Sequence, residues 1–168
     1  MIADKIIETA KKYIGKREIP NNQGFLDSTF QKKMQDVGWL KGHAWCSYFC
    51  ELVWKEAYQD DKKIVAEINK LFSASATATY KNFELARGWV LSSKPAPGAL
   101  AVWRQGVDWR GHIGIVTEVV DKNTFKSIEG NTNEQGGREG IEVARKVRLL
   151  NQPFKPKGLN VVGFILPK

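Results

Sequence analysis

Cys46 stands where a helix is expected to begin, and this position suits a nucleophile. It follows a glycine-containing loop and lies in the first turn of an apolar run that predicts a helix over residues 44–58. Unpaired N–H groups and a partial positive charge in such a turn stabilise a thiolate. The same N–H groups can bind a developing oxyanion. We therefore expect Cys46 to perform acyl transfer, the alternative being a buried small hydrophobic residue.

The second cysteine, Cys50, lies one helical turn further on and is expected in the core with Phe49, Val53 and Trp54. The spacing C-x-x-x-C lacks the tight C-x-x-C spacing of structural zinc sites, and the chain has no second thiol pair. Helical residues four apart are neighbours, but their bond vectors rarely suit a disulfide. The two cysteines therefore predict neither a metal centre nor a disulfide framework.

A thiolate nucleophile needs a base, and only His43 and His112 can supply an imidazole. His112 opens a strand rich in Val and Ile, where alternation puts it on one face with Gly114 and Val116. The small neighbour leaves room for another backbone or a substrate. His43 lies so near Cys46 in sequence that little room would remain for a substrate between them, so it is the weaker candidate. The alternative for His112 is a structural histidine at a sheet edge.

Glu129 is the candidate that would orient the imidazole. It ends a strand expected over residues 124–129, which a turn at 121–123 joins to the strand of His112. Because the residue numbers are nearly symmetric about that turn, antiparallel pairing puts Glu129 almost opposite His112. Glu129 is then expected to hold His112 through its Nδ1 and to stabilise the imidazolium, with help from Asn131. The alternative for Glu129 is an exposed surface carboxylate.

The chain changes from a helical pattern to a strand pattern near residue 90. Apolar residues at helical spacing predict helices over residues 2–15, 28–37, 44–58, 62–71 and 79–87. Short runs rich in Val, Ile and aromatic residues predict strands over residues 99–103, 112–119, 124–129, 141–149 and 161–166. Helices followed by strands predict an α+β fold, with the N-terminal helices packed on one face of a C-terminal antiparallel sheet of about five strands.

Length and composition fit a single domain over residues 1–168. Hydrophobic residues make up 42% and charged residues 26%, and no segment is long and apolar enough to cross a bilayer, so we expect no membrane insertion. The chain has 26 Lys and Arg residues and 18 Asp and Glu residues, so its net charge is +8. This charge favours attraction to a polyanion, the alternative being a basic surface that is only solvated. Because the basic residues are dispersed and no nucleic-acid-binding motif is present, we expect no nucleic acid partner.

Tryptophans near these segments are candidates for the wall of a substrate groove: Trp39, Trp45, Trp103 and Trp109. Core packing is the favoured alternative for Trp45 and Trp103, because large aromatic side chains dominate cores. Trp109 lies in an expected loop just before His112, which makes it the best groove candidate.

Together these features resemble the CHAP family, the cysteine, histidine-dependent amidohydrolases and peptidases within the papain-like and NlpC-type cell-wall hydrolases. The resemblance rests on four segments in family order, which are residues 44–49, 97–103, 111–116 and 127–131. It implies a papain-like fold with Cys46 as nucleophile, His112 as base, Glu129 as orienting residue and Asn131 as a polar auxiliary in an E-x-N element.

Some members of this family carry an acidic calcium loop before the cysteine. Before Cys46 the candidates for such a loop are Asn21, Asn22, Asp27 and Asp36, and their spacing is unlike that of an EF-hand loop. We therefore expect no required metal and no other cofactor.

The resemblance implies bacterial peptidoglycan as the substrate, cut at an amide within the stem peptide or cross-bridge, or between muramic acid and L-alanine. No signal peptide is visible in residues 1–15, where Lys and Glu interrupt the apolar residues. We expect the protein to stay in the cytoplasm until it is released or exported by a route other than Sec, and to act in the periplasm or on the cell wall. A monomeric phage lysin released by a holin, or a secreted antibacterial effector with an immunity protein, would fit.

Two other functions remain open. A cysteine protease or transamidase acting on proteins would use the same residues and differ only in substrate. A non-catalytic basic module that binds cell walls or nucleic acid would need no nucleophile, and rapid alkylation of Cys46 beside slow alkylation of Cys50 would argue against it.

Overall fold

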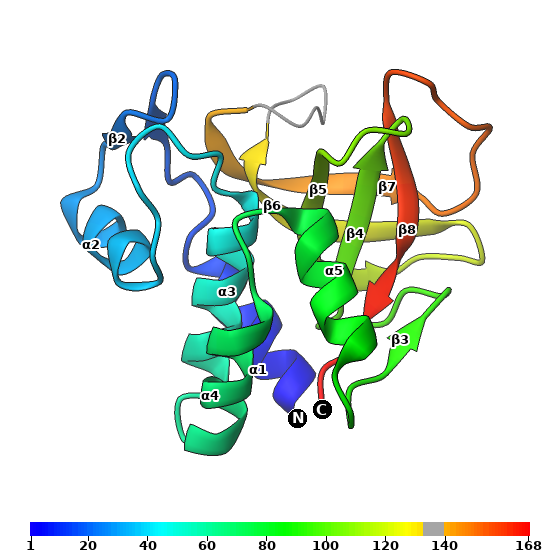
Figure 1. Cartoon of the computed structure of the whole chain (residues 1–168), viewed down its shortest axis with the longest axis horizontal. Coiled ribbons are helices and arrows are strands. Elements are labelled where there is room, and N and C mark those ends of the chain that lie inside the picture. Colours follow the sequence, from blue (N-terminus) through cyan, green and yellow to red (C-terminus); the bar gives the residue numbers. More distant parts are fainter. Residues whose placement is uncertain (133–139) are drawn as a thin grey trace.

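The computed structural model describes residues 1–132 and 140–168, and its helices precede the main strands (Figure 1). The helices in these residues are α1 (Ile2–Lys11), α2 (Ser28–Asp36), α3 (Cys46–Ala57), α4 (Lys62–Leu71) and α5 (Ala76–Leu85). Asp27, Asp61 and Ser75 cap α2, α4 and α5, because each side chain accepts a hydrogen bond from an N–H of the first turn. No helix in the described residues is both long and apolar enough to cross a membrane.

The strands of the described residues form an antiparallel six-stranded sheet and a separate two-stranded one. The large sheet has the order β3-β8-β4-β5-β6-β7. Its strands are β3 (Leu91–Ser92), β4 (Leu100–Gln105), β5 (Gly111–Val119), β6 (Thr124–Thr132), β7 (Glu142–Leu149) and β8 (Leu159–Ile165). The small sheet pairs β1 (Glu18–Ile19) with β2 (Gly24–Phe25).

The main core lies between the helices and one face of the large sheet. There α3 packs on β5 and β6, and α1 packs on α3. Ile113 and Ile115 point from β5 into this core, while Trp103 and Phe125 belong to a smaller apolar cluster on the other face. The start of α3, the start of β5 and the end of β6 lie at the same end of the molecule, uppermost in Figure 1.

The predicted α+β fold is confirmed, and each expected helix and strand is present. Three boundaries differ most: α1 ends at Lys11 rather than at residue 15, α5 begins at Ala76 rather than at residue 79, and β6 ends at Thr132 rather than at residue 129. The early start of α5 follows from its cap, since the Ser75 hydroxyl accepts a hydrogen bond from the N–H of Ala78. The two-residue strand β3 and the β1–β2 pair were not predicted, because pieces so short have no alternation to detect.

Candidate active site

Cys46 is the first residue of α3, and its side chain is 5% exposed. The residue before it, Trp45, supplies no side-chain cap, and the first backbone hydrogen bond of the helix runs from the N–H of Phe49 to the carbonyl of Trp45. Within residues 1–132 and 140–168, no capping side chain therefore occupies the N–H groups of the first turn. They provide the partial positive charge expected at the start of a helix, beside the thiol.

His112 is completely buried near the start of β5 and is hydrogen-bonded to Glu129. The bond joins His112 Nε2 to Glu129 Oε2 at 2.8 Å, so the expectation that Glu129 would hold Nδ1 was wrong. Nδ1 makes no hydrogen bond with the described residues, and the thiol of Cys46 interacts with the same ring. Because Nε2 is occupied by the carboxylate, Nδ1 is the nitrogen available to the thiol.

The pairing of β5 with β6 also differs from the expected one. Ile115 lies opposite Ile128, and the register shifts between Val116 and Glu118. Continuing this register puts Gly114, not His112, opposite Glu129. A Cβ on Gly114 would lie only 2.5 Å from Glu129 Cγ, so the absent side chain leaves the space that Glu129 crosses to reach the imidazole.

His112 and Glu129 each change the pKa of the other. Burial by itself lowers the pKa of His112, but the nearby thiol of Cys46 and the hydrogen bond and charge of Glu129 raise that pKa to about 9. Burial raises the pKa of Glu129, but Arg148 and His112 overcome this and lower that pKa below its ordinary value. The site therefore favours an ionised carboxylate next to a protonated imidazole.

Arg148 of β7 and Ser127 of β6 complete the surroundings of Glu129, and sequence reasoning missed both. Arg148 Nε donates to Glu129 Oε1 at 2.8 Å, a terminal guanidinium nitrogen donates to Oε2, and the Ser127 hydroxyl donates to Oε1 at 2.5 Å. Alternation in β7 does put Arg148 on the same face as Ala144, which pairs with Glu129. The β6–β7 register on which this depends cannot be read from spacing alone.

Asn131 is hydrogen-bonded to the backbone of the residue before the nucleophile. It is 1% exposed, and its Oδ1 accepts a hydrogen bond from the backbone N–H of Trp45 at 2.8 Å. Its Nδ2 donates to the carbonyl of Gly140 at 2.7 Å. Its φ of 54° lies in the left-handed region that asparagine tolerates. Asn131 thus fixes the backbone immediately before Cys46.

The other histidine and the other cysteine are placed differently. His43 is exposed and its Nδ1 lies 3.3 Å from the hydroxyl of Tyr48, so its ring contacts Tyr48 rather than Cys46. Cys50 is fully buried, and this burial raises the pKa of its thiol well above the ordinary value. Cys50 is a core residue, as the sequence predicted.

Trp45 and Trp103, considered above as candidates for a substrate groove, are in the core, which rules out that role and agrees with the favoured alternative. Trp45 is 0% exposed and its indole N–H donates to Glu18 at 2.6 Å. Trp103 is 2% exposed, and its ring is stacked with that of Phe125 and contacts the Arg148 guanidinium. Neither offers a surface to a ligand. Trp39, the fourth tryptophan considered, is also buried.

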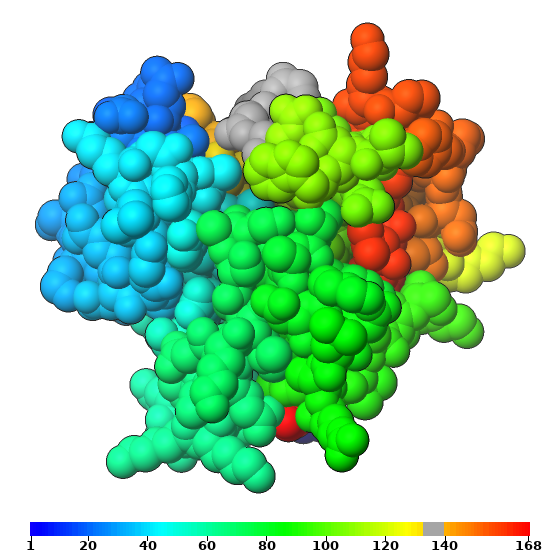
Figure 2. All heavy atoms as spheres, in the orientation of Figure 1, coloured from blue at the N-terminus to red at the C-terminus, as the bar shows by residue number. Residues whose placement is uncertain are grey.

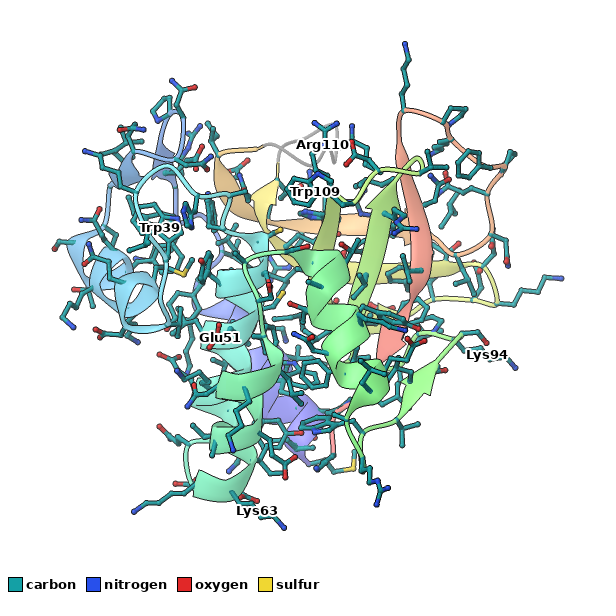
Figure 3. The ribbon with its side chains drawn as sticks, viewed as in Figure 1. Trp39, Glu51, Lys63, Lys94, Trp109 and Arg110 are labelled. Atoms are coloured by element: carbon teal, nitrogen blue, oxygen red, sulfur yellow. The ribbon has the colours of Figure 1, made fainter. Side chains whose placement is uncertain are left out.

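Trp109 remains a candidate contact with substrate, because 68% of it is exposed. It lies beside Arg110 at the upper end of the molecule in Figure 3. Its carbonyl accepts a hydrogen bond from the Thr77 hydroxyl at 2.6 Å, which ties the β4–β5 loop to the start of α5. Figure 2 shows this loop beside residues 150–158, and the N–H of Gly106 donates to the carbonyl of Gly158.

The acidic residues before Cys46 have other partners. Asp27 caps α2 and forms an ion pair with Lys16, and Asp36 pairs with Lys32. In residues 1–132 and 140–168, no three His, Cys, Asp or Glu side chains are grouped as metal ligands would be.

Comparisons with known proteins identify the family and a similar fold. A solved structure titled "The crystal structure of Ly7917" superposes with a TM-score of 0.56 at 15% identity. The alignment covers 98% of this chain and 62% of that one, so this chain spans less than two thirds of the other protein, and the likeness concerns the fold alone. No curated protein matches. The model of the CHAP domain matches residues 38–131, more than half of the sequence, and the chain therefore belongs to the CHAP family.

Proposed function

We propose that this protein is a peptidoglycan hydrolase that cuts an amide bond with Cys46 as nucleophile, His112 as base, Glu129 as orienting residue and Asn131 as auxiliary. Membership of the CHAP family indicates a hydrolase of the amidase or peptidase class acting on peptidoglycan. The observation that most directly supports the assignment of residues is the ring of His112. One of its nitrogens is bound to a buried carboxylate, and the other is available to a thiol at a helix start.

The proposed reaction begins when the Cys46 thiol gives its proton to Nδ1 of His112. The sulfur then attacks the carbonyl carbon, and N–H groups of the first turn of α3 donate to the oxyanion. His112 returns the proton to the leaving nitrogen as the C–N bond breaks, which leaves a thioester. Water, deprotonated by His112, releases the acid and restores Cys46.

Two groups hold the reacting residues in position, and a third is proposed to contact the substrate. Glu129 fixes the ring through Nε2, and this also stabilises the imidazolium formed in the first step. Asn131 holds the N–H of Trp45, so it positions the start of α3 rather than the imidazole. Trp109, exposed three residues before His112, is proposed to contact the glycan or peptide of the wall.

The remaining features of the proposal concern the setting of the enzyme. We propose one catalytic domain over residues 1–168, acting as a monomer without a metal or other cofactor. It would be a phage lysin released by a holin, or a secreted antibacterial effector paired with an immunity protein. In either case the site of action is the periplasm or the cell wall.

The decisive test is digestion of purified peptidoglycan by Cys46→Ala, followed by mass analysis of the released fragments. We expect the variant to lose at least about 1,000-fold in rate, because only binding and oxyanion contributions remain. Mass analysis of the wild-type products would identify the bond, and the wild-type reaction should proceed equally in EDTA.

The matched control is Cys50→Ala, which removes the buried thiol one turn away and should keep most of the activity. Wild-type rates from Cys46→Ala would refute the assignment of the nucleophile. Cleavage of proteins with intact peptidoglycan would instead indicate a cysteine protease or transamidase.

A further inference from the structure

We propose that Arg148 is a positioning residue whose charge offsets that of Glu129, so that Cys46 and His112 can exist together as thiolate and imidazolium. This inference rests on the proposed function, since it concerns the ionised state of the same nucleophile. It assigns a role to a residue on β7, a strand outside the segments that resemble the CHAP family.

Arg148 is held in place by a carboxylate and by an aromatic ring. Its guanidinium donates to both oxygens of Glu129, and the Nε–Oε1 distance is 2.8 Å. The guanidinium carbon also lies 5.0 Å from the centre of the Trp103 ring, and this contact helps to hold the plane of the guanidinium group. The Arg148 side chain is 15% exposed and Glu129 is fully buried, so this ion pair is largely shielded from water.

Burial makes the sum of charges in the site important. With the thiolate of Cys46, the imidazolium of His112, the carboxylate of Glu129 and the guanidinium of Arg148, the four side chains sum to zero. Without Arg148 the same ionised state would have a net charge of −1 in a poorly solvated place, which is costly. In that case zero net charge would instead be reached with Cys46 as a neutral thiol, His112 as imidazolium and Glu129 as carboxylate. Arg148 therefore favours the nucleophilic form of Cys46.

The other titratable groups of the described residues near the site cannot replace this charge. Cys50, on the inner side of α3, is a buried thiol whose pKa is raised by burial, so it stays neutral. Glu18 of β1 accepts a hydrogen bond from the indole of Trp45, and it is an acid. His43 in the loop before α3 is exposed and contacts Tyr48.

The test is the pH dependence of Cys46 alkylation by iodoacetamide, with labelling of each thiol measured by peptide mass analysis. In Arg148→Gln the midpoint of the profile should move upward by about one pH unit, since one neighbouring opposite charge is removed from the cluster. At a pH below the wild-type midpoint, alkylation should then be about tenfold slower. Arg148→Lys keeps the charge but not the two-pronged contact, so its midpoint should move much less.

A double variant separates charge from structure. Glu129→Gln combined with Arg148→Gln restores zero net charge to the thiolate–imidazolium state, so the midpoint should return toward the wild-type value. A structural role for Arg148 predicts no such rescue. The control is Arg145→Gln, which removes an exposed charge from the same strand without contact to Glu129 and should leave the profile unchanged.

Three results would overturn the inference: an Arg148→Gln profile with the wild-type midpoint, a slower alkylation rate without a shift in midpoint, or a double variant that stays as shifted as Arg148→Gln. If Arg148→Gln fails to fold, Arg148→Lys is measured alone. A shift of its midpoint by about one pH unit would refute the inference, because the charge is retained in this variant. The readout needs no cell wall. If the alkylation midpoints shift as predicted but the wild-type protein does not digest peptidoglycan, the proposed function is refuted and this inference still stands.

Discussion

At the scale of single residues, the site depends on how Glu129 is held. Its carboxylate contacts His112, Arg148 and Ser127 while fully buried. An unpaired buried carboxylate would be protonated, and it would then no longer stabilise the imidazolium. The hydrogen bonds and the guanidinium keep Glu129 ionised, so the imidazole has a fixed orientation and a raised proton affinity.

The His112–Glu129 pair should make stability depend on pH. The pKa of His112 is raised from 6.5 to about 9, so its contribution is complete below pH 6.5 and is lost as pH rises toward 9. The pKa of Glu129 is lowered from 4.5, so its contribution is present above pH 4.5 and is lost at lower pH. The pair therefore stabilises the fold most between these two ordinary values.

The measurement is thermal unfolding of the wild type and His112→Gln across this range. From pH 6.5 to 9 the wild-type melting temperature should fall more than that of the variant, which has no imidazole to titrate. Parallel curves for the two proteins would contradict the raised proton affinity of His112.

At the scale of elements, the site requires α3 to lie close to β6. Gly130 makes this contact possible, because a Cβ there would lie 2.7 Å from Trp45 Cζ3 and 2.9 Å from Phe49 Cβ. The neighbouring residues on β6, Glu129 and Asn131, point their side chains to the imidazole and to the backbone of Trp45. One strand therefore positions both the base and the helix that bears the nucleophile.

Gly130→Ala should disturb this contact. The added methyl must push α3 from the strand or displace the indole of Trp45, so we expect a loss of about 1–3 kcal/mol in the free energy of unfolding. Hydrolysis should fall as well, because Trp45 directly precedes Cys46. Urea unfolding and peptidoglycan digestion measure the two effects.

The control is Lys126→Ala on the same strand, which removes an exposed ion pair with Glu118 and should change the free energy of unfolding by less than about 0.5 kcal/mol. A Gly130→Ala protein as stable and active as this control would show that the approach of α3 to β6 is not tight.

At the scale of the whole molecule, the net charge of +8 should assist binding to bacterial walls, which carry anionic polymers. Cys46→Ala, proposed to be inactive, permits binding to be measured without digestion. Its co-sedimentation with purified walls should decrease several-fold between roughly 50 and 300 mM NaCl, because salt shortens the range of exposed charges. Binding that does not change with salt would indicate that contacts such as the one proposed for Trp109 dominate.

Local patterns in the sequence were sufficient for the fold class and for the main candidates. Apolar periodicity predicted the helices and strands, the first turn of a helix identified Cys46, and a strand with a small neighbour identified His112. The matches to family segments between residues 44 and 131 led to the CHAP family, which the family model confirms. These features are local, since each depends on residues a few positions apart.

Tertiary structure decided what depends on strand register and burial. The register shift between Val116 and Glu118 put Gly114 opposite Glu129, and the carboxylate met Nε2 rather than Nδ1. Pairing with β7 brought Arg148 to the same carboxylate, and packing placed Trp45 and Trp103 in the core rather than in a substrate groove. A one-residue change in pairing alters every cross-strand neighbour, and spacing along the chain does not contain that information. The order of amino acids specifies which side chains are available, and the pairing and packing of the folded chain specify which of their atoms meet.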